Sequence, residues 1–180
     1  MTTAAAGRQA RFEAVMTAVY EPLQRYARRR TSPDAADDVV ADALLVVWRR
    51  LDEVPADAVL PWCYRVAANC LANSRRASGR RLRLATRVAQ LEPAADVGEP
   101  ELPDPTLHAA LATLSEPDQE VLRLWAWEDL GPTEIAVVLG LTANAVSIRL
   151  HRAKGRLAEA LERMTTDADT EHHEDPEEVT

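Results

Sequence analysis

Apolar residues recur at helical spacing in several stretches of this sequence, and each stretch predicts an amphipathic helix. The first lies within residues 12–27 and is interrupted at Pro22, so we expect a kink or a division there. The second begins with Ser32 and Pro33, a capping residue and a proline at the first helical position, and runs to about Leu51. Its apolar positions predict a core stripe of Val40, Leu44, Val47, Trp48 and Leu51.

A third helix is expected from Pro61 onward, after a short loop. Its small residues form the predicted buried face, which consists of Cys63, Val66, Ala67, Cys70 and Ser74. Trp62 and Tyr64 lie at its start, where they either pack under the loop or stack on unpaired bases. Residues 92–105 then contain four prolines and show no periodicity, which predicts a linker.

This linker, placed at residues 86–105, divides an expected N-terminal domain of residues 10–85 from a C-terminal domain of residues 106–164. Residues 165–180 are too polar to fold alone and are expected to form a disordered acidic tail. The predicted fold class is therefore all-α, with two small helical domains joined by a flexible acidic linker.

Residues 130–157 contain two short helical patterns around a glycine-bearing turn, which is typical of a helix-turn-helix. Thr133 and Thr142 are the expected capping residues of the two helices, and Gly140 suits the left-handed position that ends the first. The second helix should bury Val146, Leu150, Ala153 and Leu157. Its expected outward residues are Asn144, Ser147, Ile148, His151 and Arg152, flanked by Arg149, Lys154 and Arg156. Such a face suits a recognition helix in a DNA major groove, although a merely solvated charged face is the simpler alternative.

The formal net charge of −8 argues against nucleic-acid binding until the charges are located along the chain. Residues 61–91 hold seven arginines and no acidic residue, whereas residues 92–120 hold eight acidic residues and no lysine or arginine. Residues 142–164 again carry an excess of cations. Since local clusters decide contact with phosphates, two basic segments on either side of an acidic connector remain compatible with DNA binding.

Neither a disulfide nor a metal site is expected. Cys63 and Cys70 are seven residues apart in one predicted helix, which places their Cα atoms beyond disulfide reach. Asp34, Asp38 and Asp42 recur at helical spacing and leave open an all-helical, magnesium-dependent nucleotide hydrolase, but no other helix offers an inward acidic pair. No signal peptide or membrane span is apparent, so a cytoplasmic location without membrane insertion is expected.

Three stretches together resemble the extracytoplasmic-function (ECF) group of bacterial sigma factors, within the sigma-70 family. They are ADDVVADALLVVWRRL at Ala36 to Leu51, PWCYRVAANCLANSRR at Pro61 to Arg76, and the segment from Leu114 to Leu157. The resemblance implies a promoter-specificity subunit of RNA polymerase, with one domain for the minus-10 element and one for the minus-35 element. It implies no catalytic residue, no metal and no cofactor.

The resemblance also assigns site residues. For the minus-35 element they are Thr142, Asn144, Ser147, Arg149, His151, Arg152 and Lys154. For the minus-10 element they are the loop residues Asp57, Ala58 and Val59 and the helical residues Arg65, Asn69, Asn73 and Arg76. For binding to core polymerase they are Asp37, Asp38, Asp42, Leu45 and Arg49, although the family usually has Gln then Glu where this chain has Ala41 and Asp42.

The partners that the resemblance implies are promoter DNA, the clamp coiled coil of the largest polymerase subunit, the flap of the second largest subunit and an anti-sigma factor. A helix-turn-helix activator that does not replace the sigma subunit is the nearer alternative, and the nucleotide hydrolase is the alternative from another class.

Overall fold

The structure is a computed structural model that describes residues 3–89 and 104–171, and it contains two compact units that are treated separately below. Seven α-helices and one short 3₁₀ helix make up the regular structure of these residues, and they contain no strand. The predicted all-α class is therefore confirmed. The predicted domain limits stay predictions.

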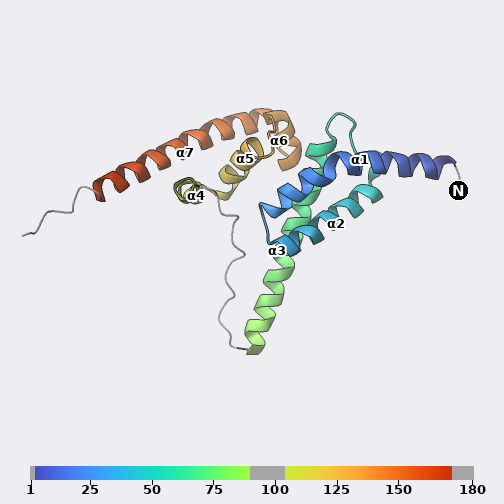
Figure 1. Ribbon diagram of the computed structural model, residues 1–180, viewed down its shortest axis with the longest axis horizontal. Helices are drawn as coiled ribbons and strands as arrows, with labels where there is room; N and C mark the ends of the chain where they lie inside the picture. Colours follow the sequence, from blue (N-terminus) through green and yellow to red (C-terminus); the bar gives the residue numbers. More distant parts are fainter. Residues whose placement is uncertain (1–2, 90–103, 172–180) are drawn as a thin grey trace, which may run out of the picture. The chain divides into compact units, whose positions relative to one another are not determined.

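The N-terminal unit consists of α1 (Thr3–Arg28), α2 (Pro33–Arg49), the 3₁₀ turn η1 (Leu51–Glu53) and α3 (Val59–Ala89). Each of its three α-helices packs against the other two (Figure 1). Their contact buries one apolar core, whose members include Val19, Leu23, Tyr26, Val40, Val47, Leu51, Cys63, Tyr64, Ala67 and Leu71. The rings of Tyr26 and Tyr64 have centroids 4.9 Å apart, so Tyr64 is a packing residue in this structure.

Several details of this unit differ from the sequence prediction. Pro22 lies inside a single continuous α1, because its neighbours on both sides still bury one apolar face. Trp48, predicted in the core, has an exposed fraction of 38%. The third helix begins at Val59 instead of Pro61, which places Pro61 in the first turn, where a proline is tolerated. It also continues to Ala89, past the predicted limit at residue 85, and Ser74 lies on its exposed side.

The next helices are α4 (Pro105–Ala112), α5 (Glu116–Ala126), α6 (Pro132–Leu139) and α7 (Ala143–Glu171). They belong to the C-terminal unit except for Ala136–Leu141, which are counted with the N-terminal unit. Asp104 caps α4, since its carboxylate accepts hydrogen bonds from the main-chain N–H groups of Thr106 and Leu107. Both α4 and α5 pack on the long α7 (Figure 1). Their shared core includes Leu111, Leu114, Val121, Leu122, Leu124, Ile135, Val146, Leu150, Ala153 and Ala160. Trp125 of α5 is exposed.

The turn between α6 and α7 has the geometry that the sequence predicted. Gly140 has a φ of 67°, and the N–H of Leu141 donates to the carbonyl of Ala136 at 3.0 Å. Thr142 caps α7 because its hydroxyl accepts from the N–H of Ala145 at 3.2 Å.

One prediction about the ends of these helices was wrong. Thr133 does not cap α6 but lies within its first turn. The capping position belongs to Gly131, whose carbonyl accepts from Ile135 and whose N–H donates to the Glu134 carboxylate. Helix α7 ends at Glu171. Residues 172–180, like most of the predicted linker, lie outside the described residues.

No single helix in the described ranges is long and apolar enough to cross a membrane. Only α6 and α7 taken together would be long and apolar enough, and the chain bends by 105° at the break between them.

Candidate nucleic-acid interface

The first three turns of α7 separate into a buried side and an exposed side, as the helical spacing predicted. Val146, Leu150 and Ala153 are buried against the C-terminal unit. The exposed side carries Asn144, Ser147, Ile148, His151 and Arg152, as expected for a recognition helix.

Four of the predicted minus-35 residues already have partners within the chain. Thr142 caps α7, and the Ser147 hydroxyl donates to the carbonyl of Ala143 at 2.9 Å. The Arg149 Nε lies 4.0 Å from an Asp118 carboxylate oxygen, and the Lys154 Nζ lies 3.3 Å from the centroid of the Trp125 ring. These side chains would have to give up or share such contacts in order to read bases.

Asn144, Ile148, His151 and Arg152 differ from them. Within the described part of the chain, the side chains of these four residues form no hydrogen bond, ion pair or ring contact. They lie at positions i, i+4, i+7 and i+8 of α7, so they share one face of the helix. This set, which we call the open row, is the part of α7 with the most freedom to meet an external ligand.

Asp118 on α5 is a structural residue that the sequence did not reveal. It is the one charged residue that the described part of the chain buries, with an exposed fraction of 5%. Its carboxylate forms a close ion pair with Arg156 of α7. It also lies near Arg149, which precedes Arg156 by seven residues in the same helix. The carboxylate thereby fixes α5 to two points of α7 that lie about two turns apart. An acidic residue in a first helical turn has an ordinary explanation as a helix-dipole partner, so its sequence position gave no signal of this role.

The predicted minus-10 residues lie along α3 and the connection before it. Arg65, Asn69, Asn73 and Arg76 are all exposed, and Arg76 donates to the Asn73 amide oxygen at 2.8 Å. Asp57 is exposed in the connection, Ala58 is half-buried, and Val59 belongs to the first turn of α3. The loop part of the predicted set is therefore shorter by one residue than expected.

The predicted polymerase-binding residues all lie on the exposed side of α2, namely Asp37, Asp38, Asp42, Leu45 and Arg49. Leu45 is the most exposed large apolar residue of the described chain, at 52%. Arg28 of α1 lies 3.9 Å from Asp37. An apolar residue among carboxylates suits a protein contact with a basic partner surface.

A groove of about 500 Å³ brings two of the predicted sets together. Asp38 and Asp42 of α2 line it with Asn73 and Arg76 of α3, and Cys70 lies beside them. Burial and the nearby Asp42 carboxylate raise the pKa of the Cys70 thiol. The described residues contain no group of His, Cys, Asp and Glu side chains that could hold a metal ion, and Cys63 and Cys70 are free thiols.

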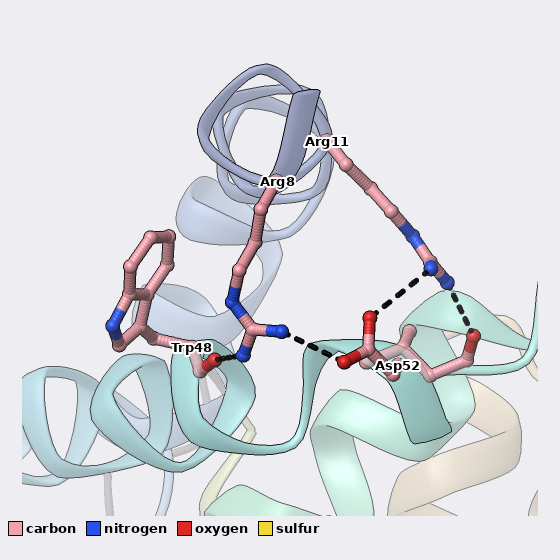
Figure 2. A network of polar contacts seen from close by, with 5 residues as sticks. Arg8, Arg11, Trp48 and Asp52 are labelled. Carbon is pink, nitrogen blue, oxygen red and sulfur yellow. Dashed lines mark hydrogen bonds and ion pairs between the residues drawn. The ribbon is translucent and has the colours of Figure 1, made fainter. Parts of the chain in front are cut away.

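A polar network that the sequence did not predict holds the start of the α2–α3 connection. Figure 2 shows Arg8 and Arg11 of α1 reaching this connection from one side. Arg8 donates to the Asp52 carboxylate and to the carbonyl of Trp48, both at 2.7 Å, and Arg11 donates to the carbonyl of Val54 at 3.1 Å. The Trp48 carbonyl belongs to the last turn of α2 and has no partner within that helix, so Arg8 supplies its donor.

The same network explains why Trp48 is not a core residue. Its ring meets Phe12 edge-on, with centroids 5.0 Å apart, and the Arg8 guanidinium lies 5.3 Å from its centroid. Trp48 therefore joins the α1–α2 contact at its margin, where one face stays open to solvent.

Comparison with known proteins agrees with this arrangement. A family model described as Sigma-70, region 4 matches residues 106–157. RNA polymerase sigma factor CnrH of Cupriavidus metallidurans is 31% identical over an alignment 185 positions long, which covers 93% of each chain. RNA polymerase sigma factor NccH of Alcaligenes xylosoxydans is 28% identical over 169 residues, which span 88% of this chain and 91% of that protein. The solved structure of CnrH in complex with the cytosolic domain of CnrY aligns with a TM-score of 0.60 and 29% identity, covering 89% of this chain and 94% of that one. The chain therefore belongs to the RNA polymerase sigma factors of the sigma-70 family, in their ECF group.

Proposed function

We propose that this sigma factor reads the minus-35 promoter element with the open row of α7, namely Asn144, Ile148, His151 and Arg152. The observation that carries the proposal is that these neighbouring side chains are exposed and have no partner in the described chain, while the opposite side of the same turns is buried. An amide and a guanidinium pair well with adenine and guanine edges in the major groove. The four residues with partners inside the chain then contribute mainly by shaping the helix or by approaching phosphates; they are Thr142, Ser147, Arg149 and Lys154.

The minus-10 element is assigned to the N-terminal unit. The exposed amides and guanidiniums of α3, from Arg65 to Arg76, form a polar stripe that suits a separated DNA strand. We infer that Asp57 and Ala58, in the connection before α3, accept an unpaired base, since Asp57 is exposed and Ala58 half-buried. Capturing unpaired bases offsets the few kcal/mol that each unstacked step costs.

The exposed face of α2 is assigned to the clamp coiled coil of core RNA polymerase, and the C-terminal unit to the flap. Polymerase supplies the catalysis, so the chain needs no active site, metal or cofactor of its own and acts in the cytoplasm. CnrH is described in complex with the cytosolic domain of CnrY. By analogy, an anti-sigma factor is the expected inhibitory partner of this chain.

Run-off transcription with purified core polymerase tests the proposal. Adding the chain should produce transcripts from defined start sites on fragments of the source genome, whereas core polymerase alone should not. Arg152→Ala should lower transcription from these promoters about fivefold or more, because a good base contact contributes about 1–3 kcal/mol. The matched control is Arg163→Ala, which removes an exposed cation farther along α7, whose Nε donates to the carbonyl of Glu159.

Two outcomes would contradict the assignment. If transcripts appear only when another sigma factor is present, the chain is an activator instead. If Arg152→Ala and Arg163→Ala behave alike, the open row is not the reading surface.

A further inference from the structure

Ile148 is an apolar residue in the middle of the polar open row. Its exposed fraction is 46%, and it lies four residues after Asn144 and four before Arg152. Positions four apart adjoin on a helix surface, so an amide and a guanidinium flank the isoleucine on the same stripe. Any base pair near these two polar groups would also face the Ile148 side chain.

Ile148 is not one of the buried residues in the described part of the C-terminal unit. Val146, Leu150 and Ala153 already provide the packing of these turns. A β-branched residue at an exposed helical site is slightly unfavourable for the helix, because its χ1 freedom is restricted. A single exposed apolar residue needs no explanation in general, but this one lies among side chains assigned to DNA.

The edges of base pairs in the major groove present one apolar group, the C5-methyl of thymine. We propose that Ile148 determines specificity in the minus-35 element by contacting the C5-methyl group of a thymine there. This inference rests on the proposed function of the open row, and it names the base feature that one of its members reads.

A protein surface is the other ligand that an exposed isoleucine could meet. Anchors of protein interfaces are usually surrounded by further apolar residues that exclude water. Ile148 instead has Ser147 and His151 beside it in addition to Asn144 and Arg152, and all four are exposed. Polar neighbours with capacity for base edges favour DNA over a protein partner.

The experiment uses holoenzyme reconstituted from core polymerase and the full chain. The preferred minus-35 element is first selected from random duplexes, and each thymine in it is then replaced singly by deoxyuridine, which removes only the methyl group. Binding of each duplex is measured by fluorescence anisotropy at fixed salt. At one of the thymine positions, wild-type holoenzyme should bind the deoxyuridine duplex about fourfold more weakly than the thymine duplex. This is the loss of affinity expected when one CH₂-sized apolar group is no longer buried.

The variants identify the residue responsible. For holoenzyme containing Ile148→Ala, the ratio of thymine to deoxyuridine affinity at that position should fall to about one, and Ile148→Val should retain part of it. Leu141→Ala removes an apolar side chain of similar exposure that precedes α7, and it should keep the wild-type ratio.

Three results would overturn the inference. One is a wild-type ratio near one at every thymine of a selected element. Another is an Ile148→Ala ratio equal to that of the wild type. The third is an Ile148→Ala chain that no longer binds core polymerase, which would make Ile148 a protein anchor. Failure of holoenzyme to select any duplex would instead refute the proposed function itself.

Discussion

The ion pairs between Asp118 of α5 and two arginines of α7 predict an asymmetry between substitutions on the two sides. Arg156→Ala leaves a carboxylate whose side chain is only 7% exposed, with Arg149 at 4.0 Å as its remaining cation. A buried charged group that loses its partner costs roughly 1–3 kcal/mol or more, and Arg149 offsets part of that loss. We expect Arg156→Ala to destabilise the C-terminal unit by about 2 kcal/mol.

Asp118→Ala should cost less. It leaves Arg149 and Arg156, whose side chains are 42% and 56% exposed, so water replaces their lost partner. We expect about 1 kcal/mol, mostly from the lost anchoring of α5 on α7. The double variant Asp118→Ala/Arg156→Ala should then be more stable than Arg156→Ala alone by about 1 kcal/mol, because no unpaired buried carboxylate remains.

Hydrogen exchange of the full-length chain measures these differences separately in each unit. Peptides from α5 and α7 should exchange fastest in Arg156→Ala, more slowly in the double variant and slowest in the wild type. Peptides from α1 and α2 serve as internal controls and should not change. A double variant less protected than Arg156→Ala would refute the asymmetry, and so would unchanged exchange in both single variants.

Three further predictions concern single positions. Gly140→Ala should destabilise the helix-turn-helix by about 1 kcal/mol because of the positive φ, whereas Gly155→Ala, inside α7 with open space at its Cβ, should be neutral or stabilising in urea unfolding. Burial raises the pKa of the Cys63 thiol to about 12 from 9.0, so its contribution to stability should be constant below about pH 9 and fall from there toward pH 12. Cys63→Ala should remove this part of the slope from a pH series of unfolding free energies. Arg8→Ala should lower stability by less than about 1 kcal/mol, yet slow promoter opening in stopped-flow assays, because Arg8 holds the α2–α3 connection assigned to the minus-10 element. Arg25→Ala removes another surface ion pair of α1 and should leave opening unchanged.

The sequence predicted those parts of the structure that depend on neighbours along the chain. Helical spacing identified the buried side of α7 through Val146 and Leu150, and residue type identified the turn at Gly140 and the cap at Thr142. Each of these signals acts over fewer than about eight residues, which is the range over which spacing and capping rules operate.

The parts that the sequence did not reveal depend on residues far apart in the chain. Arg8 lies 44 residues from Asp52, and Asp118 lies 38 residues from Arg156. Trp48 was assigned to the core because it falls on the apolar stripe of α2, but Arg8 and Phe12 hold it at the margin of the α1–α2 contact. Periodicity carries no information about which charged residues of two different helices will meet.

The division of α7 into a buried side and an open row has a consequence for engineering. The side chains of the open row are exposed and form no hydrogen bond, ion pair or ring contact in the described chain, so exchanging them should change folding stability by no more than about 0.5 kcal/mol each. Libraries randomised at these four codons should therefore yield mostly folded proteins, from which regulators with new promoter preferences are selected without compensating changes elsewhere. Natural lineages have the same freedom, so paralogues would diverge first in target sequence and only later in architecture.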